Sequence, residues 1–122
     1  MKNIVPSNII LHRKSRKLEV VFTGVSYLLD AEYLRVYSPS AEVKGHGPGQ
    51  EVLQLNKENV AIKNVQAKGN YALQIIFDDG HDSGIYSWPY LYALATEHEQ
   101  RWQDYLARVE QATTSTVKWV DP

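Results

Sequence analysis

The spacing of apolar residues in the first 45 positions predicts two extended segments followed by short helices. Runs rich in β-branched and apolar residues at 9–11 and 18–23, the second closed by Gly24, are typical of strands. Between 27 and 37 the apolar residues fall near i, i+4 and i+8, which favours a short helix. Ser38 as a cap and Pro39 in the first helical position predict one further helical turn.

The pattern of residues 60–110 changes from the period of a strand to the period of a helix. Strands are predicted at 60–67, 71–77 and 83–86, and the Asp-Gly pair within 78–81 predicts a tight hairpin turn. With Ser87 as a cap, helical spacing then runs from residue 88 to about residue 110. Its apolar stripe is Leu91, Leu94, Ala95, His98, Trp102, Tyr105 and Val109.

These elements predict an α+β fold, a small antiparallel β-sheet domain with a long C-terminal helix packed on one face. We expect one domain over residues 9–111, with flexible tails at 1–8 and 112–122. A chain of 122 residues with 43% hydrophobic and 22% charged residues is ordinary material for one globular domain.

Composition also bears on location and cofactors. No apolar run approaches the roughly 20 residues of a membrane helix, and the N-terminus lacks the apolar core of a signal peptide. We therefore expect a cytoplasmic protein without a membrane partner. The absence of cysteine excludes disulfides, thiolate zinc sites and an iron–sulfur cluster held by cysteines of this chain.

Charge is distributed unevenly along the chain. Residues 1–77 contain ten Lys/Arg and six Asp/Glu, whereas residues 78–122 contain three and eight. The basic run at 12–17 could contact a phosphate-rich or acidic partner, but a solvated approach to the first strand is the favoured interpretation. Without a wider basic face, nucleic-acid binding is not favoured. The glycines of the loop at 44–49 are spaced GxGxG and do not match the dinucleotide fingerprint.

His81 is the candidate for chemistry because it lies in the predicted turn between Asp79 and Asp82. It could be a general base, a metal ligand or a histidine that hydrogen-bonds within the turn. His46, in the glycine loop, could approach it. Ser83, Ser87 and Asp82 offer parts of a hydrolase triad, but no nucleophile elbow such as G-x-S-x-G accompanies them.

Three blocks of sequence resemble the DUF971 family, the small domain similar to the N-terminal domain of gamma-butyrobetaine hydroxylase, here as a stand-alone bacterial-type member. The resemblance covers about residues 9–111. The blocks are LRVYSPSAEVKGHG at 34–47, GNYA at 69–72 and FDDGHDSGIYSW at 77–88.

The resemblance implies an accessory β-rich domain and, in the hydroxylase, a structural zinc held by a C-x-C-x2-C cluster and one histidine. The cluster's positions fall on Ser38, Ser40 and Val43, and the histidine's position falls on His81. Two hydroxyls and a valine cannot replace three thiolates, so the resemblance implies the fold without the zinc site.

The dioxygenase activity of the hydroxylase does not transfer to this chain. No histidine here begins the H-x-D or H-x-E motif of an iron(II) enzyme, because the residues two positions on are Lys14, Pro48, Ser83 and Gln100. The same domain is also fused to ATPases that resemble iron–sulfur carriers, which implies a role beside metal, iron–sulfur or cofactor handling.

Three functions are compatible with the sequence. The favoured one is an accessory module without its own catalysis, which binds a protein partner through Arg35, His46, His81 and Trp88. The second is a metal-binding accessory protein, with Zn or Fe at His81, His46 and Asp79 or Asp82; otherwise no cofactor is predicted. The third is a small hydrolase or isomerase.

Overall fold

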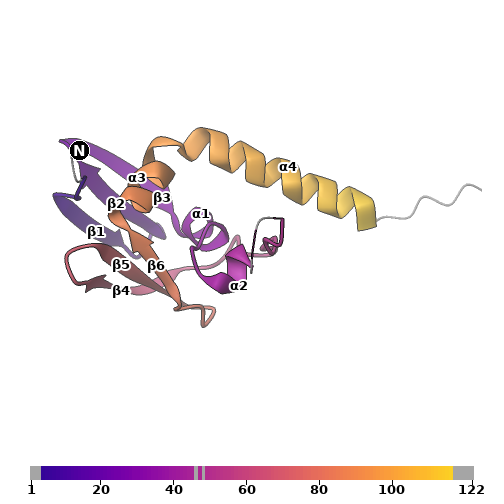
Figure 1. Ribbon diagram of the computed structural model, residues 1–122, viewed down its shortest axis with the longest axis horizontal. Coiled ribbons are helices and arrows are strands. Elements are labelled where there is room, and N and C mark those ends of the chain that lie inside the picture. The colour runs from indigo at the N-terminus through magenta and orange to yellow at the C-terminus, as the bar shows by residue number, and fades with distance from the viewer. Residues whose placement is uncertain (1–3, 46, 48, 117–122) are drawn as a thin grey trace, which may run out of the picture.

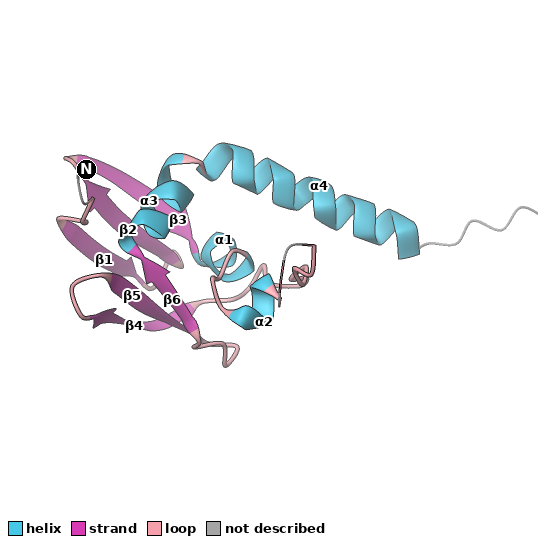
Figure 2. Cartoon of the chain, in the orientation of Figure 1, coloured by secondary structure: helices cyan, strands magenta, loops and turns pink. Residues whose placement is uncertain are grey.

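The computed structural model describes residues 4–45, 47 and 49–116, and the side chains up to residue 113. In this part of the chain two three-stranded antiparallel sheets are accompanied by helices (Figures 1 and 2). The predicted α+β class is therefore confirmed, but the strands form two sheets rather than one.

The first sheet has the order β1 (Asn8–His12), β2 (Lys17–Phe22), β3 (Val25–Asp30). Phe22 pairs with Val25, and the intervening Thr23 and Gly24 have φ angles of 48° and 79°, which suits the twist of a two-residue hairpin. The helix predicted from residue 27 is wrong for 27–30, because these residues pair with β2. Helix α1 (Ala31–Val36) begins only where that pairing ends.

Helix α2 (Ala41–Lys44) begins two residues later than predicted. Its cap is Ser40, whose hydroxyl accepts the backbone N–H of Glu42 at 3.2 Å. The prediction of Ser38 as the cap is wrong, because the Ser38 hydroxyl instead accepts the N–H of Ser40 at 3.2 Å and contacts His81. Residues 38 and 40 are therefore fixed side by side at the start of α2.

The second sheet has the order β4 (Ile62–Lys68), β5 (Ala72–Phe77), β6 (Gly84–Ser87). The predicted strands are confirmed to within about two residues. The turn at 78–81 is part of a longer loop between β5 and β6, in which Gly80 has a φ of 91°. The backbone N–H of Phe77 donates to the His81 carbonyl at 2.9 Å, which closes this loop.

The C-terminal helical segment is two helices, α3 (Trp88–Thr96) and α4 (His98–Thr116). Ser87 caps α3, as predicted, by accepting the N–H of Tyr90 at 3.3 Å. The prediction of one continuous helix is wrong at Glu97, where the backbone has a φ of −105° and α3 ends. Residues 112–116, predicted as part of a flexible tail, continue α4.

One hydrophobic core joins the inner faces of both sheets with α1 and α3. Its fully buried members include Leu18 and Phe22 from the first sheet, Ile75 from the second, Leu34 from α1 and Leu91 from α3. Helix α4 adds Tyr105, which is 4% exposed, and then extends past the body of the molecule (Figure 1). No helix in the described part of the chain is long and apolar enough to cross a membrane.

Candidate functional site

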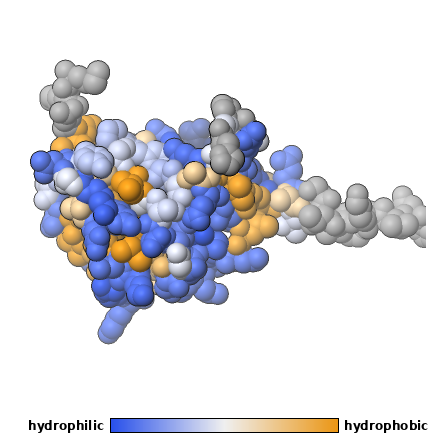
Figure 3. Space-filling view, turned by 60° about the horizontal axis from the view of Figure 1, so that its bottom comes forward, coloured by the Kyte–Doolittle hydropathy of each residue, from blue (hydrophilic) through white to orange (hydrophobic). Residues whose placement is uncertain are grey.

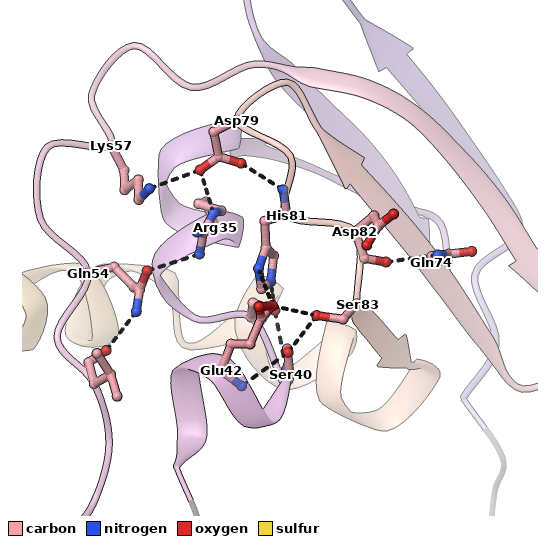
Figure 4. A network of polar contacts seen from close by, with 12 residues as sticks. Arg35, Ser40, Glu42, Gln54, Lys57, Gln74, Asp79, His81, Asp82 and Ser83 are labelled. Carbon is pink, nitrogen blue, oxygen red and sulfur yellow. Dashed lines mark hydrogen bonds and ion pairs between the residues drawn. The ribbon is translucent and has the colours of Figure 1, made fainter.

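His81 lies in the β5–β6 loop with its ring directed into the protein, where 6% of the residue is exposed. Its Nε2 is 2.8 Å from the Ser38 hydroxyl. Its Nδ1 is 3.3 Å from the carboxylate of Glu42, and Figure 4 shows these two side chains. Both ring nitrogens therefore have a partner from the segment around α2.

Two further serine contacts attach α2 to the same loop. The hydroxyls of Ser40 and Ser83 are 2.7 Å apart, and Ser83 donates to the Glu42 carboxylate at 2.9 Å (Figure 4). Together with His81, these residues form a hydrogen-bonded network, called here the α2–loop network: Ser38, Ser40, Glu42, His81 and Ser83. Since its members come from positions 38–42 and 81–83, it holds together two segments distant in sequence.

A second cluster lies beside this network and is centred on Asp79. Its carboxylate accepts hydrogen bonds from Arg35 Nε and Lys57 Nζ, each at 2.9 Å, and from the backbone N–H of His81 at 3.1 Å (Figure 4). Arg35 also donates to the Gln54 side chain at 3.1 Å. Partial burial opposes ionisation, but the donors from Lys57, His81 and Arg35 lower the pKa of Asp79 to about 2.

Burial is the main cause that lowers the pKa of His81, and the positive charge of Arg35 adds to it. The carboxylates of Glu42 and Asp79 oppose this effect without reversing it. The neutral imidazole is therefore favoured, and it joins the Ser38 hydroxyl to the Glu42 carboxylate.

The residues predicted to form an interaction surface lie mostly below the surface. Arg35, His81 and Trp88 are 7%, 6% and 8% exposed. The Trp88 indole N–H donates to the Asn70 carbonyl at 2.8 Å, and its ring belongs to the core. His46 lies outside the described residues.

The structure adds site residues that sequence reasoning missed. Glu42, Lys57 and Gln54 contact His81, Asp79 and Arg35 respectively. The sequence marks Glu42 only as an acid in a predicted helix, and nothing in the spacing of Lys57 or Gln54 points to this site. Of the predicted partners of His81, Asp79 contacts its backbone, and the backbone carbonyl of Asp82 accepts from Gln74 at 2.8 Å.

Ser38, His81 and Glu42 have the connectivity of a serine hydrolase triad, with serine on one ring nitrogen and a carboxylate on the other. These residues are not the predicted parts, because Ser83 belongs to the α2–loop network and Ser87 caps α3. Ser38 is only 1% exposed, and a Cβ added at Gly84 would lie 2.6 Å from its hydroxyl oxygen. The candidate nucleophile is therefore buried, and it packs against the backbone of Gly84.

The positions of the zinc cluster implied by the resemblance also meet here. Ser38 contacts His81, Ser40 follows it at the start of α2, and Val43 is buried in that helix. Hydroxyl and valine side chains do not fit a zinc ion that requires thiolates. In the described part of the chain no group of three or more His, Asp or Glu is arranged to hold a metal ion.

The basic run at 12–17 lies on the β1–β2 hairpin, away from these clusters in sequence. Arg13 and Arg16 donate to the backbone carbonyls of Lys63 and Asn59, at 2.6 and 3.2 Å. Lys17 pairs with Asp30, and His12 pairs with Glu19 at 2.8 Å. The contacts of Arg13 and Arg16 connect the β1–β2 hairpin to residues 59–63, whereas the pairs of Lys17 and His12 lie within the first sheet.

The fold and the α2–loop network define a small α+β domain whose most elaborate polar site is internal. A sequence model of the family described as "Gamma-butyrobetaine hydroxylase-like, N-terminal" matches residues 9–92, and the chain belongs to this family.

Solved structures resemble this chain over most of its length. Two NMR solution structures are 51% and 44% identical, with TM-scores of 0.83 and 0.78. The first match covers 92% of this chain and 89% of the other, and the second covers 98% and 96%. No curated protein matches the sequence.

A crystal structure of a DUF971 protein with unknown function, from Acidithiobacillus ferrooxidans ATCC 23270, is 35% identical with a TM-score of 0.62. That match covers 74% of this chain and 91% of the other. The resemblance to DUF971 is thereby confirmed, and the family is one of unknown function.

Proposed function

We propose that this protein is an accessory module without its own catalysis, which acts by binding a protein partner in metal, iron–sulfur or cofactor handling. The main support for the absence of catalysis is that Ser38 is only 1% exposed. Ser38 is the serine whose contacts most resemble those of a catalytic triad. A nucleophile needs an open site about 3 Å away for the reacting atom. Gly84 and Tyr86 pack against one side of Ser38.

The hydrogen bonds of Ser38 support the same interpretation. Its oxygen accepts the Ser40 N–H, contacts His81 and interacts with the Tyr86 hydroxyl. In the described residues every buried side-chain nitrogen and oxygen has a hydrogen-bond partner. A polar network satisfied from within rigidifies a fold and offers no free group to a substrate.

A fluorophosphonate probe tests the absence of serine catalysis directly. We expect intact-mass spectrometry to find no adduct on the protein, while a known serine hydrolase treated in parallel is labelled. An adduct mapped to Ser38 would overturn the non-catalytic assignment.

Affinity capture tests the binding half of the proposal. The wild-type chain and its Ser38→Ala variant, once shown to be folded, should enrich the same protein from a lysate, because Ser38 stabilises the domain and does not touch the partner. No enrichment above an unrelated protein of similar size, by either chain, would contradict the proposed role.

A further inference from the structure

A pocket of about 220 Å³ lies between α4, α3 and the segment that follows α2. Its apolar lining comes from Val36, Val43, Val52 and Leu53. Val52, whose backbone N–H donates to the Val43 carbonyl at 2.8 Å, is 52% exposed. Figure 3 shows hydrophobic surface at the end of the body from which the C-terminal segment leaves. The lining could therefore bury an apolar body of small size.

Three cations line the same pocket and lie over tyrosine rings. Lys44 Nζ is 4.6 Å from the centre of the Tyr90 ring. The guanidinium carbons of Arg101 and Arg108 are 5.6 and 5.8 Å from the centre of the Tyr37 ring. Arg108 also donates to the Tyr37 hydroxyl at 3.3 Å. Ring contacts hold these cations in place while leaving N–H donors for an anion.

The cations outnumber the carboxylates around the pocket. Arg101 pairs with Glu97 at 3.0 Å, but neither Lys44 nor Arg108 takes part in an ion pair between described residues. The one carboxylate among the described lining residues is Glu51, which accepts the Gly49 N–H at 3.2 Å. Hydrogen bonds from backbone N–H groups are the main cause that lowers the pKa of Glu51, and the positive charge of Arg108 lowers it further.

The positive charge at the pocket contrasts with the acidic composition of the C-terminal part of the chain. Residues 78–122 contain three Lys/Arg against eight Asp/Glu. Two of the three, Arg101 and Arg108, line this pocket. A wider hollow along α4, of about 560 Å³, shares Tyr37, Arg101 and Arg108 with the pocket, and its lining also includes Glu97 and Asp104.

We propose that the pocket binds a small organic anion, a carboxylate carried on an apolar or aromatic body. The carboxylate would take charge-assisted hydrogen bonds from Lys44, Arg101 and Arg108, and the body would lie against the valines and tyrosines. The pocket is smaller than the roughly 300–1,000 Å³ of sites for drug-sized ligands, which favours a ligand of metabolite size. The site adjoins the α2–loop network, because Ser38 also lines the pocket, and it needs no protein partner.

NMR titration of the ¹⁵N-labelled full chain tests the proposal with three matched probes. Phenylacetate has both the charge and the body, phenylacetamide has the body alone, and acetate has the charge alone. We expect phenylacetate to shift the amides around the pocket, and the other two to bind at least about tenfold more weakly, since each lacks one class of contact. Added salt should weaken phenylacetate binding because screening reduces the attraction of its carboxylate.

Side-chain replacements locate the binding site. Arg108→Gln and Lys44→Gln remove charge at exposed positions, so the fold should persist, as the dispersion of the spectrum will show. Each should raise the dissociation constant for phenylacetate about tenfold, whereas the matched control Lys14→Gln, on the exposed β1–β2 turn, should leave it unchanged. Equal binding of phenylacetate and phenylacetamide, shifts centred elsewhere, or unchanged affinity in both pocket variants would overturn the proposal.

Discussion

The buried contact between Ser38 and His81 depends on the absence of a side chain at residue 84. A Cβ on Gly84 would lie 2.6 Å from the Ser38 hydroxyl oxygen and 3.1 Å from the Tyr86 ring. Because real Cβ contacts do not reach 2.6 Å, any larger residue at position 84 must displace Ser38. Glycine is therefore required at position 84 by packing against the α2–loop network.

A double-mutant cycle measures this dependence. Gly84→Ala should lower the free energy of unfolding by about 2 kcal/mol through overpacking, and Ser38→Ala by about 1–3 kcal/mol because buried donors lose their acceptor. In the double variant the clashing oxygen is gone, so the combined loss should be smaller than the sum. Urea denaturation gives the four values, and strictly additive losses would contradict the packing argument.

His81 should make stability depend on pH in a defined direction. Because burial lowers the pKa of His81 below its ordinary 6.5, the unfolded chain binds the proton more readily than the folded chain. The stability contributed by the neutral imidazole is present above pH 6.5 and is lost as the pH falls from there toward the folded pKa. Urea midpoints at about pH 7.5, 6.5 and 5.5 should therefore fall in that order in the wild-type protein.

The His81→Gln variant separates this effect from the general acid sensitivity of the fold. A glutamine side chain cannot titrate, so the midpoint of this variant should fall less between about pH 7.5 and 5.5 than the wild-type midpoint does. Lys14→Gln, which removes a charge far from the network in sequence, should retain the wild-type profile. An identical fall in wild type and His81→Gln would show that His81 is not responsible.

At the scale of elements, local sequence patterns predict those strands and helix caps whose formation depends mainly on residues nearby in the sequence. The period-two pattern locates β5, and the Asp-Gly pair locates the turn in which Gly80 adopts a positive φ. Residues 27–30 are wrongly predicted as helix because Leu28 and Leu29 also fit a helical period. These residues form a strand because they pair with β2, as Leu29 does with Leu18. Local periodicity does not reveal such a contact between distant residues.

The candidate site is less predictable than the fold for the same reason. The sequence points to His81 as a chemical centre, and the structure does place it among polar side chains. Its partners come from the segment around α2, some 40 residues earlier, and the burial that lowers its pKa arises only when α2 packs on the loop. The cations of the proposed pocket escape sequence reasoning because Lys44 and the α4 arginines lie in separate segments.

At the scale of the whole molecule, two small sheets behave as one unit if the core between them is continuous. The core cluster contains side chains from both sheets, and the arginines of the β1–β2 hairpin, Arg13 and Arg16, donate to carbonyls of residues 63 and 59. A sheet with one apolar face must bury that face against another element. Neither sheet is therefore expected to unfold alone.

Replacing both arginines separates the contribution of the surface contacts from that of the core. Arg13→Gln together with Arg16→Gln should lower the free energy of unfolding by at most about 1 kcal/mol, because both hydrogen bonds are solvent-exposed. The transition should nevertheless remain single. We expect equal urea midpoints by tryptophan fluorescence, to which Trp88, Trp102 and Trp119 contribute, and by circular dichroism, which reports on the backbone. Lys14→Gln, which also replaces an exposed cation with glutamine, is the control and should leave the midpoint unchanged.

If the double variant instead unfolds in two separated steps, the arginines rather than the shared core couple the two sheets. The molecule would then be two units joined at the hairpin.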